Sequence, residues 1–175
     1  MVSHKTTDNS PLLVNTAELL NATDREGLIA ELRQLKQRRI TAVSFRRQNA
    51  MRIGTPFLRD ALNDFGMKVC LIGFAGGFTG TLGRSYEQCV TDTRLALEYA
   101  TKMGARGVVV VPGARGLHTY NHAERTIRDG LNDCLDDALR LRIDMLLPVN
   151  GIFGHKNDVF CPDSCSLLDL SLIHI

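Results

Sequence analysis

Apolar residues recur at helical spacing in four segments of the chain, and most of these segments carry capping signals at their ends. The pattern predicts helices that begin at the capping box Thr23–Glu26, at Thr55–Pro56, at the capping box Ser85–Gln88 and near Asn121. The second and third helices should end before Gly66 and Gly104, because glycine suits the left-handed position that follows a helix. We therefore expect four amphipathic helices with polar outer faces.

Short apolar segments between the helices suit buried strands. They are Thr41–Phe45, Met67–Phe74, Gly107–Val111 and Ile143–Val149, with Leu12–Val14 as a weaker candidate. The run Val108–Val111 is β-branched throughout, which is typical of a strand covered on both faces in a parallel sheet. Alternation of strands and helices predicts an α/β fold with helical crossovers. Both an open doubly wound sheet and a (β/α)8 barrel accommodate that order.

Composition and charge exclude several classes of protein. The chain has 175 residues, with 21 Lys+Arg against 19 Asp+Glu and a net charge of +2. That balance predicts no nucleic-acid partner and no membrane partner, and no apolar run reaches the ~18 residues of a membrane span. Without an apolar export signal, the five cysteines are interpreted as reduced thiols of a cytoplasmic protein.

The glycine-rich segment Gly73–Gly83 follows a predicted strand but matches neither the dinucleotide fingerprint nor the P-loop. Its backbone amides, Arg84 and the helix start at Ser85 form a candidate phosphate cradle. Glycines also serve tight turns, and that interpretation is at least as well supported. The loop alone names no ligand.

Two loop motifs carry a resemblance to a known family. Phe74–Gly80 followed by Gly83–Ser85, and Val108–Arg115 followed by the histidine-bearing segment His118–Arg125, are similar to strands and loops of the sugar phosphate isomerase/epimerase family. The resemblance implies a xylose-isomerase-like TIM barrel, the (β/α)8 fold, of which residues 11–169 would supply about the first five βα units. A barrel typically needs ~250 residues, so the barrel would be incomplete.

The resemblance also implies a chemistry. Family members hold a divalent metal (Mn, Mg, Zn or Co is left open) with carboxylates and a histidine from the later strands. The cation and acid–base glutamates move a proton beside a carbonyl, through an anionic enediolate that the cation stabilises. Here Leu147 occupies the position of the first carboxylate ligand, and Asn150 stands where the family often has histidine. We therefore expect no metal site and no cofactor in this chain.

The candidate substrate-binding residues are Arg115, His118, His122 and Asn150. Arg115 follows a buried strand, and its guanidinium should point into the barrel mouth toward an anionic or hydroxylated ligand. His118 and His122 are four residues apart, which suits hydrogen bonding to substrate or, less well, a metal. Another interpretation places His122 in a helix cap, with Asn121 as N-cap and Glu124 at the third position. An ion pair between loops is the alternative for Arg115.

The remaining cysteines and charged residues are interpreted as structural or surface residues and not as site residues. His155 with Cys161 and Cys165 lacks standard zinc spacing, so chance is the preferred explanation. Cys70, Cys89 and Cys134 fall on apolar faces and are interpreted as small core residues, and the pair Asp136–Asp137 as a solvated helix face.

Both ends of the chain are set apart from the fold. Residues 1–10 are polar and are predicted to be disordered. Leu170–Ile175 matches the translation of a transposase adapter used in sequencing libraries, so residues 170–175 are interpreted as non-native, with the start of a further helix as the alternative. We therefore expect a fragment of a longer protein.

The sequence thus predicts a fragment of a sugar isomerase/epimerase-like protein, whose partner is a small sugar or sugar phosphate. The alternative is a non-catalytic sugar-binding relative that has lost its metal, as Leu147 suggests. DNA-repair endonucleases that share the barrel are disfavoured, because they need metal-binding histidines where this chain has Phe74 and Val111. Exposed edges of an incomplete barrel favour a homo-oligomer.

Overall fold

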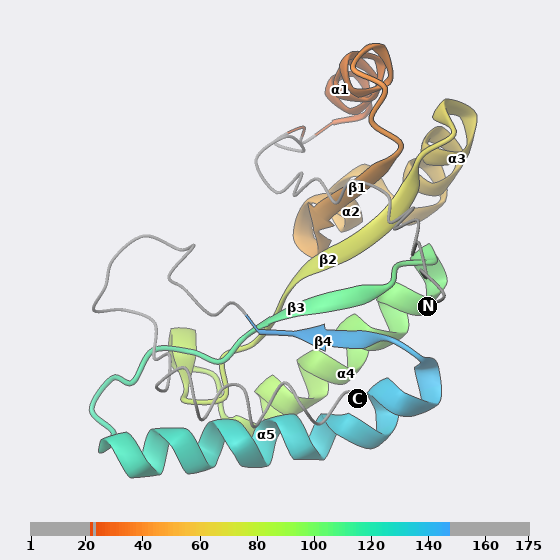
Figure 1. Ribbon diagram of the computed structural model, residues 1–175. Coiled ribbons are helices and arrows are strands. Elements are labelled where there is room, and N and C mark those ends of the chain that lie inside the picture. Colours follow the sequence, from red (N-terminus) through yellow and green to blue (C-terminus); the bar gives the residue numbers. More distant parts are fainter. Residues whose placement is uncertain (1–21, 23, 148–175) are drawn as a thin grey trace, which may run out of the picture.

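The computed structural model describes residue 22 and residues 24–147 (Figure 1). Along the chain the elements are α1 (Arg25–Gln37), β1 (Ala42–Arg46), α2 (Arg47–Ile53), α3 (Thr55–Phe65), β2 (Lys68–Gly76), a 3-10 turn (Thr81–Gly83), α4 (Tyr86–Met103), β3 (Gly107–Val111), α5 (Tyr120–Leu141) and β4 (Asp144–Leu146). The predicted strand Leu12–Val14 and the segments 1–10 and 170–175 lie outside the described residues. Among the described residues, no helix is long and apolar enough to cross a bilayer.

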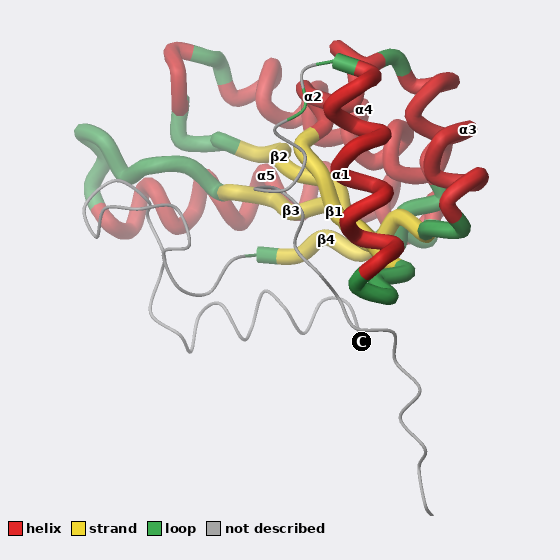
Figure 2. Tube along the Cα trace, turned by 90° about the horizontal axis from the view of Figure 1, so that it is seen from above, coloured by secondary structure: helices red, strands yellow, loops and turns green. Residues whose placement is uncertain are grey.

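The four strands form one parallel sheet in the order β1-β2-β3-β4, and Figure 2 shows them side by side with helices around them. Val43 pairs with Val69, Ile72 with Val108, and Val108 with Met145. Chain order without a reversal is the topology of a barrel and not of a doubly wound sheet, which needs a switch point. The predicted parallel α/β sheet is confirmed, and its strand order favours the barrel.

The strand boundaries differ modestly from the prediction. β2 continues two residues past the expected Phe74, to Gly76, because its last residues pair with β3. β4 is shorter than the predicted segment Ile143–Val149, which extends beyond the described residues. Register shifts in β1 and β2 bend both strands near their carboxyl ends.

The hydrophobic core lies between the sheet and its helices. α4 packs on β2 and β3, and α5 lies alongside α4. Val108 and Val110 are fully buried, each contributing about 1.5–3 kcal/mol. The expectation that this run is covered on both faces is wrong, because Val109 and Val111 are only half-buried. The core lies on the other face of β3, with Val108 and Val110.

Several capping predictions are confirmed. Ser85 Oγ accepts from the amide of Gln88 at 3.3 Å, and Gln88 Oε1 accepts from the amide of Ser85 at 2.8 Å, which completes the capping box of α4. Gly66 and Gly104 adopt the left-handed conformation after α3 and α4. These caps fix where both helices end, at the amino-terminal edge of the sheet.

Other helices begin at residues that the pattern did not select. Asp24, not Thr23, caps α1 by accepting from the amide of Gly27 at 2.8 Å. Thr55 is the first residue of α3, and its hydroxyl instead contacts the hydroxyl of Tyr99 at 3.2 Å. Neighbouring residues compete for a cap position, and at α3 the contact of Thr55 with Tyr99 replaces a cap hydrogen bond.

Helix α2 was not predicted. It has seven residues and no side-chain cap, and only Ala50 and Ile53 are buried. Two buried positions in two turns give no periodic signal that a sequence could show.

Candidate functional site

The loops that follow β2 and β3 lie side by side at the carboxyl-terminal edge of the sheet. The amide of Gly77 donates to the carbonyl of Val111 at 2.8 Å, and Thr79 Oγ1 donates to the carbonyl of Ala114 at 2.6 Å. Gly76 permits this approach, since it has φ +97° and a Cβ there would lie 2.3 Å from the Val111 carbonyl oxygen. Gly76 therefore serves the close approach of two backbones.

An aromatic side chain anchors the loop after β2 to helix α5. Phe78 is 1% exposed, and its ring lies against Gly130. A Cβ at Gly130 would lie 2.4 Å from that ring, so the helix needs glycine here. Phe78 thus holds the loop in place and also forms part of the pocket beside it.

A pocket of about 520 Å³ opens between these loops and the first turns of α4 and α5. Its lining combines hydroxyl, imidazole and carboxylate groups, from Phe78, Thr79, Gly80, Tyr86, Glu87, His118, His122, Thr126 and Asp129. Such groups donate to and accept from hydroxyl groups of a polar ligand. The arrangement is chemically suited to a polyhydroxylated small molecule.

The two predicted histidines meet in this pocket. Their ring centroids lie 4.9 Å apart. His118 Nε2 contacts the carbonyl of Thr79 at 3.2 Å, which makes that nitrogen the donor and Nδ1 an acceptor. His122 Nδ1 accepts from the guanidinium of Arg125 at 3.3 Å, which leaves Nε2 as the donor. One ring therefore offers an acceptor and the other a donor.

The capping interpretation of His122 is corrected. Thr119 is the N-cap of α5, not Asn121, and its hydroxyl accepts from the amide of His122 at 3.4 Å. Glu124 pairs with Arg128 at 3.1 Å and does not reach back to the cap. The backbone of His122 thus serves the helix start, while its imidazole lines the pocket.

Arg115 and Asn150 are not brought to this pocket by the described structure. Arg115 is exposed in the loop after β3, and its carbonyl accepts from the amide of His118 at 3.1 Å. It is not among the residues that line the pocket. Asn150, like His155, Cys161 and Cys165, lies outside the described residues, so its predicted role stays a prediction.

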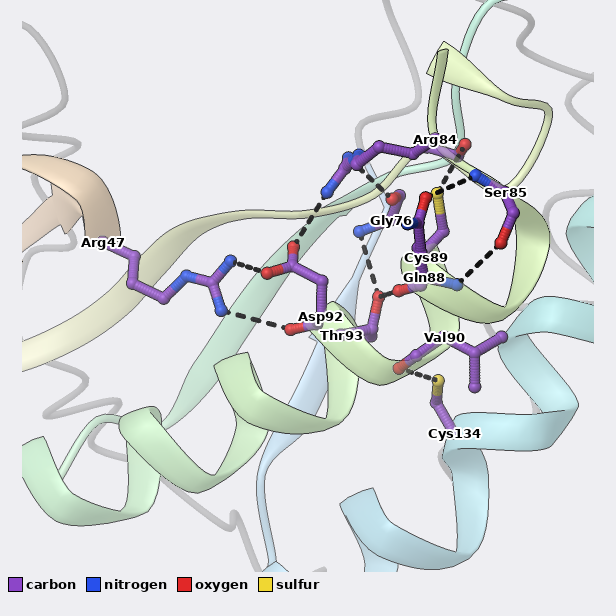
Figure 3. A network of polar contacts seen from close by, with 11 residues as sticks. Arg47, Gly76, Arg84, Ser85, Gln88, Cys89, Val90, Asp92, Thr93 and Cys134 are labelled. Atoms are coloured by element: carbon purple, nitrogen blue, oxygen red, sulfur yellow. Dashed lines mark hydrogen bonds and ion pairs between the residues drawn. The ribbon is translucent and has the colours of Figure 1, made fainter. Parts of the chain in front are cut away.

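A network of ion pairs ties three parts of the sheet's carboxyl edge together (Figure 3). Asp92 of α4 pairs with Arg47 of α2 and with Arg84 Nη1, the latter at 3.2 Å. Arg84 Nη2 also donates to the carbonyl of Gly76 at 3.3 Å. Arg84 is thus engaged within the protein, which weakens the phosphate-cradle hypothesis. No pattern in the sequence signals the Arg47–Asp92 pair, which spans 45 residues.

The cysteines behave as predicted core residues. Cys70, Cys89 and Cys134 are buried free thiols. Burial raises the pKa of the Cys89 thiol, which donates to the carbonyl of Gly77 at 3.2 Å, and raises the pKa of Cys134 to about 11. Beside Cys89, the buried Thr93 hydroxyl accepts from the amide of Gly76 at 3.1 Å. The Cys89 thiol and the Thr93 hydroxyl thus support the loop after β2, and burial disfavours the thiolate form of all three cysteines.

The acidic side chains of α5 divide between two roles. Asp136 is exposed, as predicted, whereas Asp137 is half-buried and pairs with Arg140 at 2.6 Å and Arg94 at 3.0 Å. The hydrogen bond from Arg140 lowers the pKa of Asp137. Asp137 is therefore ion-paired and not only solvated, because Arg94 of α4 lies within reach.

Tyr86 lines the pocket with its hydroxyl already held by α5. That hydroxyl donates to Asp133 Oδ2 at 2.7 Å. Burial and this hydrogen bond raise the pKa of Tyr86, so the phenol stays protonated at neutral pH.

The described residues do not fit a metal ion. Residues 24–147 contain no group of three or more His, Cys, Asp or Glu side chains arranged to hold one. Leu147, at the position that the resemblance gives to a carboxylate ligand, is half-buried and packs against the hydrophobic core. We therefore derive no chemical step through a metal from this part of the chain.

Comparisons with known proteins identify the fold. No protein-family model and no curated protein matches the sequence. Protein SMc04130 from Sinorhizobium meliloti 1021 superposes with a TM-score of 0.69 and 22% identity, over 87% of this chain and 55% of its own. D-allulose 3-epimerase from Methylomonas sp. superposes with a TM-score of 0.69 and 12% identity, over 91% of this chain and 58% of its own.

Further solved structures show the range of proteins with this architecture. The IolI protein with a bound zinc atom has a TM-score of 0.61 and 16% identity, over 77% of this chain and 50% of its own. A family 2 AP endonuclease from Brucella melitensis has a TM-score of 0.64 and 17% identity, over 81% of this chain and 56% of its own. The chain has the xylose-isomerase-like TIM-barrel fold, as predicted, and spans about half the length of these structures.

Proposed function

We propose that this chain is part of a sugar isomerase or epimerase, and that the pocket between the loops after β2 and β3 binds a small sugar or sugar phosphate. Solved structures with this fold include sugar epimerases, which supports the class of reaction. The observation that carries the proposal is the meeting of His118 and His122 at the carboxyl-terminal edge of a parallel sheet, where such barrels place their sites.

The pocket residues have distinct parts in this proposal. His118 Nδ1 accepts from one sugar hydroxyl, and His122 Nε2 donates to another. The carboxylates of Glu87 and Asp129 accept from further hydroxyls, because both line the pocket. Arg115 and Asn150 remain proposed contacts of the same substrate, and Arg115 would suit a phosphate group.

The intact protein would use a divalent metal, which would supply positive charge beside the sugar carbonyl during proton transfer. The IolI structure holds zinc in the same fold, which supports a metal in this family of barrels. The described residues do not supply its ligands, so the proposal assigns none here. A cytoplasmic location and a homo-oligomer belong to the same proposal.

A second candidate is a sugar-binding protein without turnover. It is favoured by Leu147, which packs on the core where a catalytic relative would have a carboxylate. Both candidates would bind sugar in the same pocket, and only the first would convert it to product. A role on DNA is disfavoured, although an AP endonuclease shares the fold, because the net charge is only +2.

Calorimetric titration of the chain with D-allulose and D-fructose tests the proposal. The His118→Phe and His122→Phe variants keep an aromatic ring but remove the nitrogens. Each should weaken binding several-fold, and the double variant by ~10-fold or more, because each lost hydrogen bond is worth ~0.5–1.5 kcal/mol. Lys102→Gln, an exposed change at the far end of α4, is the control. Undiminished binding by the double variant would refute the proposed pocket.

A further inference from the structure

A second pocket, of about 660 Å³, lies at the opposite edge of the sheet from the two histidines. It is formed by the carboxyl-terminal ends of α3 and α4 and the amino-terminal ends of β1, β2 and β3. None of the residues that line it also lines the candidate sugar pocket. It is therefore a separate cavity.

The rim of this amino-edge pocket is cationic. Arg59 of α3, Lys68 at the start of β2 and Arg106 in the turn before β3 all line it, and no carboxylate does so among the described residues. Arg106 Nε pairs with Asp144 at 3.3 Å, but these side chains are 81% and 50% exposed, and such pairs are weak. Within residues 24–147, Arg59 and Lys68 form no ion pair. The positive charge is thus mostly uncompensated.

The helix ends at this pocket do not cancel that charge fully. Free carbonyl groups at a helix carboxyl terminus repel an anion. Here the amide of Gly66 donates to the carbonyl of Asn63, and the amide of Met67 to that of Leu62 at 2.8 Å. α4 ends in the same way, through the amides of Gly104 and the next residue. The last-turn carbonyls are partly satisfied, so the cations dominate the rim.

The floor of the pocket is apolar. Leu62, Val69 and Met103 line it, and each is less than 9% exposed. Cys70 lies there too, and Arg106 is close enough to its thiol to lower the pKa, although burial raises that pKa more. A ligand that satisfies this pocket therefore carries both an anionic group and a short apolar part.

We propose that the amino-edge pocket binds a small organic anion, with its charged group among Arg59, Lys68 and Arg106 and its alkyl part on the floor. The anionic group is a carboxylate or a phosphate monoester, which share the charge and the acceptor oxygens that these cations recognise. Because the pocket lies at the edge away from the loops after β2 and β3, its ligand is not the sugar substrate.

Titration of the whole chain with four probes separates the contributions of the charged head group and of the alkyl chain to binding. Hexanoate and hexyl phosphate should both bind, and the tighter of the two identifies the preferred head group. Hexanol lacks the charge and inorganic phosphate lacks the chain, so each should bind ~10-fold or more weakly than the tighter anion. The tighter anion should also slow the alkylation of Cys70 several-fold. Binding of inorganic phosphate as tightly as hexyl phosphate, or no binding of either hexyl anion at millimolar concentration, would overturn the proposal.

Surface substitutions locate the site. Lys68→Gln and Arg106→Gln should each weaken binding of the tighter anion by ~10-fold, because each removes a cation from the rim. Arg33→Gln removes another exposed cation, from α1 and outside the pocket, and should leave binding unchanged. All three residues are exposed, and circular dichroism verifies that each variant folds. Equal weakening in all three variants would show a general effect of charge and would contradict the proposed site.

Discussion

The two edges of the sheet are built in opposite ways. At the amino-terminal edge, short turns follow α3 and α4, with hydrogen bonds that span only a few residues, as at Gly66 and Gly104. At the carboxyl-terminal edge, long loops are held by contacts between distant residues, such as Arg47 with Asp92 and Phe78 with Gly130. The first edge depends on local sequence and the second on the whole fold.

The chemistry of the two edges differs as well. The pocket at the carboxyl edge contains two histidines and two carboxylates, whereas the pocket at the amino edge contains three cations and an apolar floor. The first suits hydroxyl groups and the second suits an anion. One sheet therefore carries two unlike candidate sites, and each can be disturbed without the other.

The largest expected effect is the absence of catalytic turnover. The carboxyl edge has groups that can hydrogen-bond to hydroxyls, but the described residues include no set of metal ligands, and loss of even one electrostatic stabiliser costs ~10²–10³ in rate. We expect the 175-residue chain to give no epimerase activity with added Mn, Mg, Zn or Co, measured by chromatography of the sugar products. Chelator-sensitive turnover would show that the 175-residue chain does hold a catalytic metal.

Removing the loop anchor should destabilise the chain more than any change on the loop surface. Phe78→Ala should lower the free energy of unfolding by ~3–5 kcal/mol, because it opens a cavity against α5. The matched control is Leu117→Ala in the neighbouring loop, where the side chain is fully exposed and the expected change is within ~0.5 kcal/mol. Urea denaturation measures both, and equal effects would mean that Phe78 is no anchor.

Ion pairs at the two edges should differ in strength. Asp92→Asn should lower the free energy of unfolding by ~1–2 kcal/mol, because it leaves the mostly buried Arg47 without its charged partner. Asp144→Asn breaks an exposed pair at the other edge and should cost ~0–1 kcal/mol. The same denaturation experiment compares them. A larger loss of unfolding free energy in Asp144→Asn than in Asp92→Asn would contradict this difference between the edges.

The smallest expected effect is a pH-dependent change in Tm when the Asp137 carboxylate is removed. The hydrogen bond from Arg140 lowers the pKa of Asp137, so this carboxylate stabilises the fold above its unfolded pKa, and the stabilisation is lost as pH falls through the lowered folded pKa. Asp137→Asn should therefore reduce Tm slightly at about pH 7 and much less at about pH 2. An equal reduction at both pH values would show that the ionic form has no part in it.

Local signals predicted features at both edges, whereas contacts between distant residues were not predictable. The capping box at Ser85, at the carboxyl edge, and the glycine after α4, at the amino edge, depend on neighbouring residues, so the sequence showed them. The pairing of His118 with His122 was visible as a four-residue spacing. The Phe78–Gly130 contact was not, because nothing local relates two residues that meet only after α4 and β3 have packed. Helix α2 was missed because it is too short for a periodic pattern.

The most direct test of the account is to map where a sugar contacts the chain. In a titration with D-allulose followed by nitrogen-15 NMR, the imidazole signals of His118 and His122 and the amide of Thr126 should shift together. The signals of Lys68 and Arg106, at the other edge, should stay in place. Shifts confined to the amino edge, or histidine signals that do not move at saturating sugar, would contradict a sugar site at the carboxyl-terminal edge.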